Sequence, residues 1–181
     1  PNGRPINGYR ELPAPPDPGS VAVVSGCVVS PASVSGDIYH CVPNAAAADV
    51  CWPSTPGSLL CLNDPWDKGL HRVAHSEELP HVKAPMSPEP FALLLEDGTK
   101  CRLRNGGAWD GRDEGPVAAY GCLGSDLAVL VPSQPDALAA AIDRAQPMWT
   151  VKVGALGAGN SLIEAEDRLA RRQEVGLLGR S

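Results

Sequence analysis

The chain has 181 residues, a net charge of −6 and a pI near 5.1, which suits one domain with short extra arms. Its basic residues form no cluster before Arg171 and Arg172, which argues against nucleic acid or an anionic membrane surface as the main partner. No stretch approaches the roughly 20 apolar residues of a membrane span. With only one Phe, three Tyr and four Trp, the core must consist mainly of Val, Leu and Ala, which bury less area than aromatic rings.

Residues 1–20 carry six of the 19 prolines, so we expect an extended arm or stalk there and a single disulfide-stabilised domain at residues 21–181. The chain starts without a signal peptide, as a secreted protein numbered from its mature start would. The run "VAVVSGC" that ends at Cys27 matches a bacterial lipobox, but its apolar part is only about six residues, shorter than a signal sequence needs. We therefore favour a strand whose cysteine joins a disulfide.

Six cysteines are the strongest compositional signal. Their number is even, and no C-x-x-C or other close zinc-ligand spacing occurs among them. Such a set predicts three disulfides and an oxidising compartment, whereas six buried free thiols in a cytosolic protein are the alternative. The sequence leaves the pairing among them open; they are Cys27, Cys41, Cys51, Cys61, Cys101 and Cys122.

Prolines interrupt residues 41–90 so often that no helical stripe of apolar residues survives. Apart from one or two helical turns at residues 45–50, we expect this half of the chain to be loop held by disulfides. From residue 91, "FALLLEDGTKCRLR" predicts a hairpin that turns at Asp97-Gly98. Two more strands are expected in "VAAYGC" and "DLAVLVP", with a glycine turn at Gly124 between them.

Two helices are expected late in the chain. Ser133 stands at capping distance from Asp136, and Pro135 suits a first helical turn, so we expect a helix over residues 135–145. "MWTVKVG" alternates and predicts a strand. "NSLIEAEDRLARRQEVG" opens with the capping box of Ser161 and Glu164, which predicts a final helix. The sequence therefore predicts an α+β fold: a mostly antiparallel sheet with two late helices, preceded by a loop-rich, disulfide-stabilised N-terminal half.

Candidate metal ligands are His71, His75 and His81. The first two are four residues apart, the spacing that places two ligands on one helical face. A zinc protease would need H-E-x-x-H, but Arg72 stands where the Glu is required, so surface histidines are the favoured interpretation. "DGRDEG" does not have the alternation of a calcium loop, and "GALGAGNS" lacks the Lys of a phosphate-binding loop. We predict no catalytic residue and no cofactor.

Binding residues are the more plausible candidates. Trp66 follows the turn residues "NDP", which should present its ring at the end of a loop. Residues 101–122 form a glycine-rich stretch between two cysteines, and a Cys101–Cys122 disulfide would contribute on the order of 3 kcal/mol in the chain-entropy model. This stretch would present a recognition loop, made of Trp109, Asp110, Asp113 and Glu114.

Three stretches carry a resemblance: "CLNDPWDKGLHRV", "PFALLLEDGTKCRLRNGGAWDGRDEGPVAAYGC" and "PMWTVKVG". Together they resemble exported actinobacterial cell-envelope proteins of the mycobacterial type, over about residues 60–155. The resemblance implies export, disulfides and a family without an established activity. It brings no catalytic residues with it.

We therefore expect a secreted or envelope-tethered binding module without catalytic activity, whose partner is a protein or a cell-wall component. One alternative is a cell-envelope hydrolase, metal-dependent through His71, His75 and an acid. Another is an accessory structural subunit of a membrane or cell-wall complex, with the N-terminal arm and the C-terminal helix as its contacts.

Overall fold

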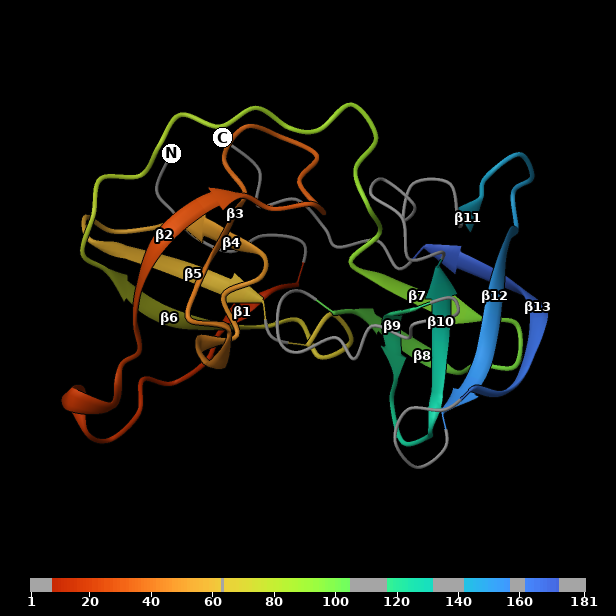
Figure 1. Ribbon diagram of the computed structural model, residues 1–181. Coiled ribbons are helices and arrows are strands. Elements are labelled where there is room, and N and C mark those ends of the chain that lie inside the picture. Colours follow the sequence, from red (N-terminus) through yellow and green to blue (C-terminus); the bar gives the residue numbers. More distant parts are fainter. Residues whose placement is uncertain (1–7, 63, 105–116, 132–141, 157–161, 173–181) are drawn as a thin grey trace. The chain divides into compact units, whose positions relative to one another are not determined.

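Two compact units divide the chain, one spanning Pro1–Pro88 with Val175–Ser181 and the other spanning Glu89–Glu174. In each unit the strands close into a β-barrel (Figure 1). The structure is a computed structural model that describes residues 8–62, 64–104, 117–131, 142–156 and 162–172. Within these ranges the only helical segments are two short 3-10 helices, Pro18–Ser20 (η1) and Asn44–Ala46 (η2).

The first barrel is a meander of short strands. Its members are β2 (Val23–Val29), β3 (Tyr39–Val42), β4 (Cys51–Pro53), β5 (Ser58–Leu62) and β6 (Gly69–His75), and β1 (Arg10–Glu11) adds to the edge of β6. Successive strands pair antiparallel from β2 to β6. Because a meander of five strands begins and ends in the same direction, the pair that closes the ring, β2–β6, is parallel.

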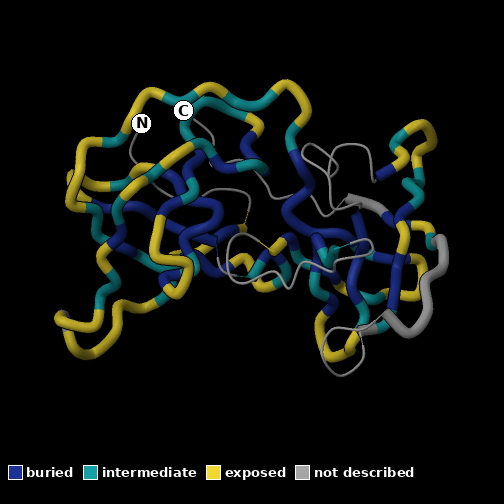
Figure 2. The backbone as a smooth tube through the Cα atoms, in the orientation of Figure 1, coloured by how far each residue is buried: buried dark blue, intermediate teal, exposed yellow. Residues whose placement is uncertain are grey.

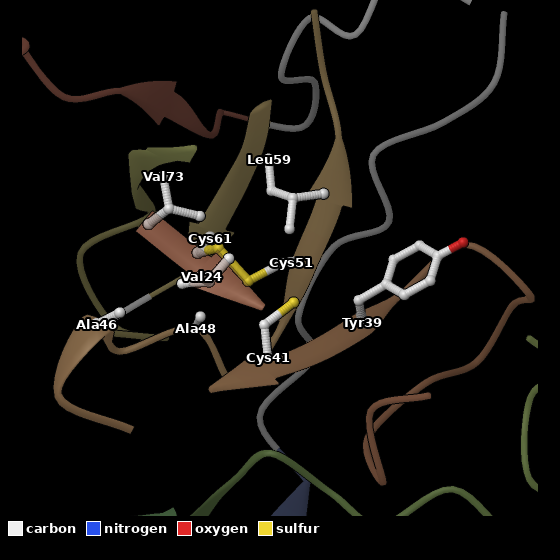
Figure 3. Close-up of a cluster of buried hydrophobic side chains, with 9 residues drawn as sticks. All are labelled: Val24, Tyr39, Cys41, Ala46, Ala48, Cys51, Leu59, Cys61 and Val73. Carbon is white, nitrogen blue, oxygen red and sulfur yellow. A yellow bond between two sulfur atoms is a disulfide. The ribbon is translucent and has the colours of Figure 1, made fainter. Parts of the chain in front are cut away.

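The first barrel buries sulfur and alanine together with leucines such as Leu59, Leu62 and Leu70. Two disulfides, Cys27–Cys41 and Cys51–Cys61, each join neighbouring strands. Figure 3 shows the second of these among the buried side chains of the cluster. That cluster consists of Val24, Tyr39, Cys41, Ala46, Ala48, Cys51, Leu59, Cys61 and Val73. Disulfides between adjacent strands therefore form part of the buried cluster, beside Tyr39 and Leu59.

The expectation that residues 41–90 are loop held by disulfides missed the strands β4, β5 and β6, although residues 76–90 contain no strand. The prolines that interrupt residues 41–90 fall between the strands or at a strand end, as Pro53 does at the end of β4, so they break helices without preventing a barrel of short strands. The expected helical turn near residues 45–50 is η2, one turn that starts at Asn44. The strand expected before Cys27 is confirmed as β2, and its cysteine joins a disulfide.

The second barrel is closed by antiparallel pairs alone. Its strands are β7 (Ala92–Leu95), β8 (Lys100–Leu103), β9 (Val117–Cys122), β10 (Leu127–Val131), β12 (Trp149–Leu156) and β13 (Leu162–Arg172), and β11 (Ile142–Asp143) extends the edge of β12. The ring runs β7-β8-β9-β10-β12-β13 and closes where β13 pairs with β7. An even number of meandering strands permits this antiparallel closure.

The hairpin expected after residue 91 is confirmed as β7 and β8. The Asp97 carboxylate accepts a hydrogen bond of 2.8 Å from the Thr99 amide, and Gly98 takes the positive φ of 87° that the turn needs. Cys101 lies directly opposite Cys122 in the β8–β9 pairing, and the two form a disulfide as the sequence suggested.

The expected α+β fold is wrong, because the described residues after residue 91 form strands and no helix. The last segment, expected to be a helix after Ser161, is the long strand β13, which pairs with β12 along its length. Its alternation is visible at Leu169, which is exposed, and Ala170, which is buried. The expected helix at residues 135–145 lies mostly outside the described residues, but its end is strand β11, where Ile142 pairs with Val151. Backbone pairing with the neighbouring strands outweighs the local capping signals.

A tyrosine in each barrel donates to the carbonyl of a proline in the chain that follows β6. The Tyr39 hydroxyl donates to Pro80 O at 3.0 Å, and the buried Tyr120 hydroxyl donates to Pro90 O at 2.9 Å. Burial raises the pKa of the Tyr39 hydroxyl. Most strands of both barrels contain buried residues, drawn dark blue in Figure 2, whereas β2 buries only Val24.

Candidate functional site

The turn that carries Trp66, residues 64–69, joins β5 to β6 in the first barrel. Two carboxylates hold it in shape: Asp64 Oδ1 accepts from the Trp66 amide at 2.8 Å, and Asp67 Oδ1 accepts from the Gly69 amide at 2.6 Å. Lys68, inside the second of these turns, adopts a positive φ of 56°. Two consecutive turns of this kind fix the backbone without help from a ligand. The tight turn that the sequence predicted at Asp64 is therefore confirmed, with Trp66 half-buried in it.

The N-terminal arm braces this Trp66 turn from one side. The Arg10 amide donates to Lys68 O at 3.0 Å, and the Leu12 amide donates to Leu70 O at 2.7 Å. The Lys68 ammonium lies 5.7 Å from the centre of the buried Tyr9 ring. From Gly8 to Leu12 the arm is thus part of the barrel wall, and it restricts the Trp66 turn further.

Arg72 fastens the same arm to the barrel through its side chain. Its guanidinium binds both carboxylate oxygens of Glu11, at 2.8 and 2.9 Å, and donates at 2.7 Å to the Ser58 hydroxyl. Such a two-pronged contact fixes orientation as well as charge. Arg72, which stands where a zinc-protease motif requires Glu, therefore has a structural role.

The three histidines considered as metal ligands are not brought together. His71 and His75 lie on strand β6, where a separation of four residues places them on one face but about 13 Å apart along the strand. Val73, which is fully buried, lies between them. His71 Nε2 lies 2.9 Å from Ala46 O, and His81 is exposed in the chain beyond β6. The helical-face argument does not apply to a strand, and no group of His, Cys, Asp or Glu suited to a metal occurs in the described ranges.

Trp109, Asp110, Asp113 and Glu114, the other proposed binding residues, lie outside the described residues. The strands that flank them are described: β8 ends at Leu103, and β9 begins at Val117. Whether these four side chains form a recognition loop stays a prediction.

An exposed valine face on β2 and β3 was missed by the sequence analysis. Val23, Val28 and Val42 are 61%, 54% and 42% exposed. A bulge between Ser25 and Val28 shifts the alternation of β2, so that Val28 faces outward where an unbroken strand would turn it inward. Across from Val28, His40 contacts the buried Asp49 carboxylate at 3.4 Å. The only sequence signal for the bulge is Gly26, which has a positive φ of 52°.

A second feature that the sequence did not reveal combines Glu89, Arg144 and Trp149 in the second barrel. The Arg144 guanidinium donates to Glu89 Oε2 at 2.8 Å and lies 5.3 Å from the centre of the Trp149 ring. Burial raises the pKa of the Glu89 carboxyl, and the Arg144 charge opposes this shift. No motif joins residues so far apart in sequence, so only the barrel reveals the group.

Comparison of the chain with family models, with curated proteins and with solved structures finds no match. None of the helices in the described residues is long and apolar enough to cross a membrane. The three disulfides indicate an oxidising, extracytoplasmic environment.

Proposed function

We propose that this protein is a secreted or envelope-tethered binding module without catalytic activity, and that the Trp66 turn is part of its binding surface. The observation that carries the proposal is the fixed turn itself, in which the amides of the half-buried Trp66 and of Gly69 each donate to a carboxylate. A backbone already fixed in its turn loses little conformational entropy on binding, and tryptophan is among the residues enriched at binding hot spots.

The sequence resemblance to exported cell-envelope proteins and the three disulfides support an extracytoplasmic site of action. The proposed partner is a protein or a cell-wall component of that compartment. The valine face of β2 and β3 offers a further apolar surface, although three separately exposed valines form a patch of ordinary size for a monomer. We therefore assign the main contact to Trp66.

The test compares purified wild-type protein with Trp66→Ala and with Met86→Ala, a control at a fully exposed residue of the same unit. Each is titrated against isolated cell-wall material and against detergent-solubilised envelope membrane proteins from an actinobacterium. We expect saturable binding to one fraction that weakens at least about tenfold in Trp66→Ala and stays unchanged in Met86→Ala. Absence of saturable binding to both fractions, or equal binding by the two variants, would contradict the proposal.

A thermal melt separates loss of contact from loss of fold. Since Trp66 is only half-buried, Trp66→Ala should retain a cooperative transition. If it does not, Trp66→Phe, which keeps an aromatic ring in the turn, replaces it in the same titration.

A further inference from the structure

The group formed by Glu89, Arg144 and Trp149 stands at one end of the second barrel. Strands β7 and β12 are both antiparallel to β13, so they run in the same direction, and Trp149 and Leu95 both pair with Ala170. Glu89 lies just before β7, Trp149 is the first residue of β12, and Arg144 follows β11. Three separate segments thus bring a carboxylate, a guanidinium and an indole ring to one barrel end.

The charges within this group cancel. The Glu89 carboxylate and the Arg144 guanidinium form an ion pair at 2.8 Å, with side-chain exposures of 10% and 26%. A ligand that meets the pair therefore encounters hydrogen-bonding capacity without net charge. Charged ligands would lose hydration without gaining an opposite charge, so the pair favours an uncharged one.

One acceptor atom in the group remains open to a ligand. Glu89 Oε2 accepts the hydrogen bond from Arg144. Glu89 Oε1 makes no hydrogen bond with the described residues, and it is not fully buried. Glu89 as a whole is only 8% exposed. A carboxylate oxygen that is poorly hydrated, yet reachable, accepts a hydroxyl hydrogen bond strongly.

The Trp149 ring supplies the apolar element beside that acceptor. It is half-buried, and the Arg144 guanidinium 5.3 Å from its centre fixes both the ring and the carboxylate. A ring of this kind packs well against the C–H groups of a flat, partly polar molecule.

We propose that this barrel end binds an uncharged saccharide, with a sugar hydroxyl donating to Glu89 Oε1 and a sugar face packed on Trp149. Saccharides combine hydroxyl donors with apolar C–H faces in one ring, which is the combination that the group can satisfy. Arg144 is a positioning residue, because it holds the other two. This site belongs to a different unit from the Trp66 turn, and the inference does not depend on the proposed function.

The test uses the full chain with intact disulfides and three neutral trisaccharides: cellotriose, maltotriose and N,N′,N″-triacetylchitotriose. Binding is followed by saturation-transfer NMR and by calorimetric titration, with trigalacturonate as the anionic probe and triglycine as the peptide probe. We expect saturable binding of at least one neutral trisaccharide and weaker binding of trigalacturonate and triglycine.

Variants then assign the contact. Trp149→Ala should weaken binding at least about tenfold, and Glu89→Gln should weaken it less because an amide oxygen remains as a neutral acceptor. Asp97→Asn is the matched control, since it breaks another carboxylate–guanidinium pair of the same barrel, to Arg168 at 2.6 Å, and should leave binding unchanged. Trp149→Phe covers the case in which the alanine variant does not fold.

Three outcomes would overturn the inference. The first is that no neutral trisaccharide binds the wild-type protein. The second is that binding survives both Trp149→Ala and Glu89→Gln. The third is that triglycine or trigalacturonate binds more tightly than every neutral trisaccharide.

Discussion

The two barrels reach stability in different ways. The first closes with a parallel pair, contains two disulfides, and surrounds a cluster rich in alanine and half-cystine. The second closes with antiparallel pairs, contains one disulfide, and buries Phe91, Leu93 and Tyr120. Tyr120 and Phe91, the two largest fully buried side chains, lie in the second barrel, whereas the first barrel buries mainly leucine and valine and carries two of the three disulfides. We therefore expect the first barrel to depend more on its covalent links.

Replacing all four cysteines of the first barrel by alanine should have the largest effect. Each link contributes roughly 3 kcal/mol in the chain-entropy model, so the variant should lose on the order of 6 kcal/mol, comparable with the whole stability of a typical domain. Hydrogen exchange should become fast at Leu59 and Val73 while Val129 stays protected. The control is a variant with alanine at both Cys101 and Cys122. Slow hydrogen exchange at Leu59 in the four-alanine variant would contradict the comparison of the two barrels.

Truncation of Phe91 should be the most damaging change of a side chain in the second barrel. Phe91 is 2% exposed, and Phe91→Ala should lower the free energy of unfolding by about 3–5 kcal/mol. Arg102, whose guanidinium lies 5.5 Å from the Phe91 ring centre, provides the control: Arg102→Gln should cost about 1 kcal/mol or less. Urea denaturation measures both. If Phe91→Ala costs no more than Arg102→Gln, the core of this barrel does not depend on its large side chains.

The hydrogen bonds of Tyr39 and Tyr120 allow the two barrels to be compared at one bond each. Tyr120→Phe leaves the Pro90 carbonyl without its donor in a buried site, so we expect a loss of about 1–2 kcal/mol. Tyr39→Phe should cost less, because the bond to Pro80 is only partly buried and water can replace it. Equal losses in urea denaturation, or a larger loss for Tyr39→Phe, would show that the two bonds are not distinguished by burial.

The smallest effects are opposite pH dependences of two carboxylates in the second barrel. Burial raises the pKa of Glu89 above 4.5, so its contribution to stability is present below that pH and is lost as the pH rises through the raised value. Hydrogen bonds from the Thr99 side chain and backbone, in that order, lower the pKa of Asp97 below 3.8. Its contribution is present above that pH and is lost as the pH falls.

Unfolding free energies of the wild type, Glu89→Gln and Asp97→Asn across the acidic range measure this contrast. The stability of the wild type relative to Glu89→Gln should fall with rising pH, and its stability relative to Asp97→Asn should rise. Parallel pH profiles would contradict the assignment of the two environments.

Local signals in the sequence identified most strands of the second barrel but not the barrels themselves. The Asp97-Gly98 turn and the alternation after Trp149 are properties of neighbouring residues, so the hairpin and β12 were predictable. The capping box at Ser161 is equally local, yet β12 and β7 both pair with the segment that follows and make it a strand. Pairing between distant strands has no local signature, which is why the closed rings were missed.

In the candidate site, too, features set by neighbouring residues were predictable and features set by distant pairing were not. Asp64 before Pro65 predicted the turn that carries Trp66. The Glu89–Arg144 pair joins segments that only the closed barrel brings together, and the outward turn of Val28 follows from a bulge. The separation of His71 from His75 depends on whether they lie on a helix or a strand, and that choice was made by pairing with β5.

The central claim is that the chain forms two closed barrels, each with disulfides between neighbouring strands. Disulfide mapping tests this claim most directly. Peptic peptides of the unreduced protein, separated and identified by mass spectrometry, should contain the pairs Cys27–Cys41, Cys51–Cys61 and Cys101–Cys122 and no free thiol. A link between a cysteine of the first barrel and either cysteine of the second, or a free thiol in the folded protein, would contradict it.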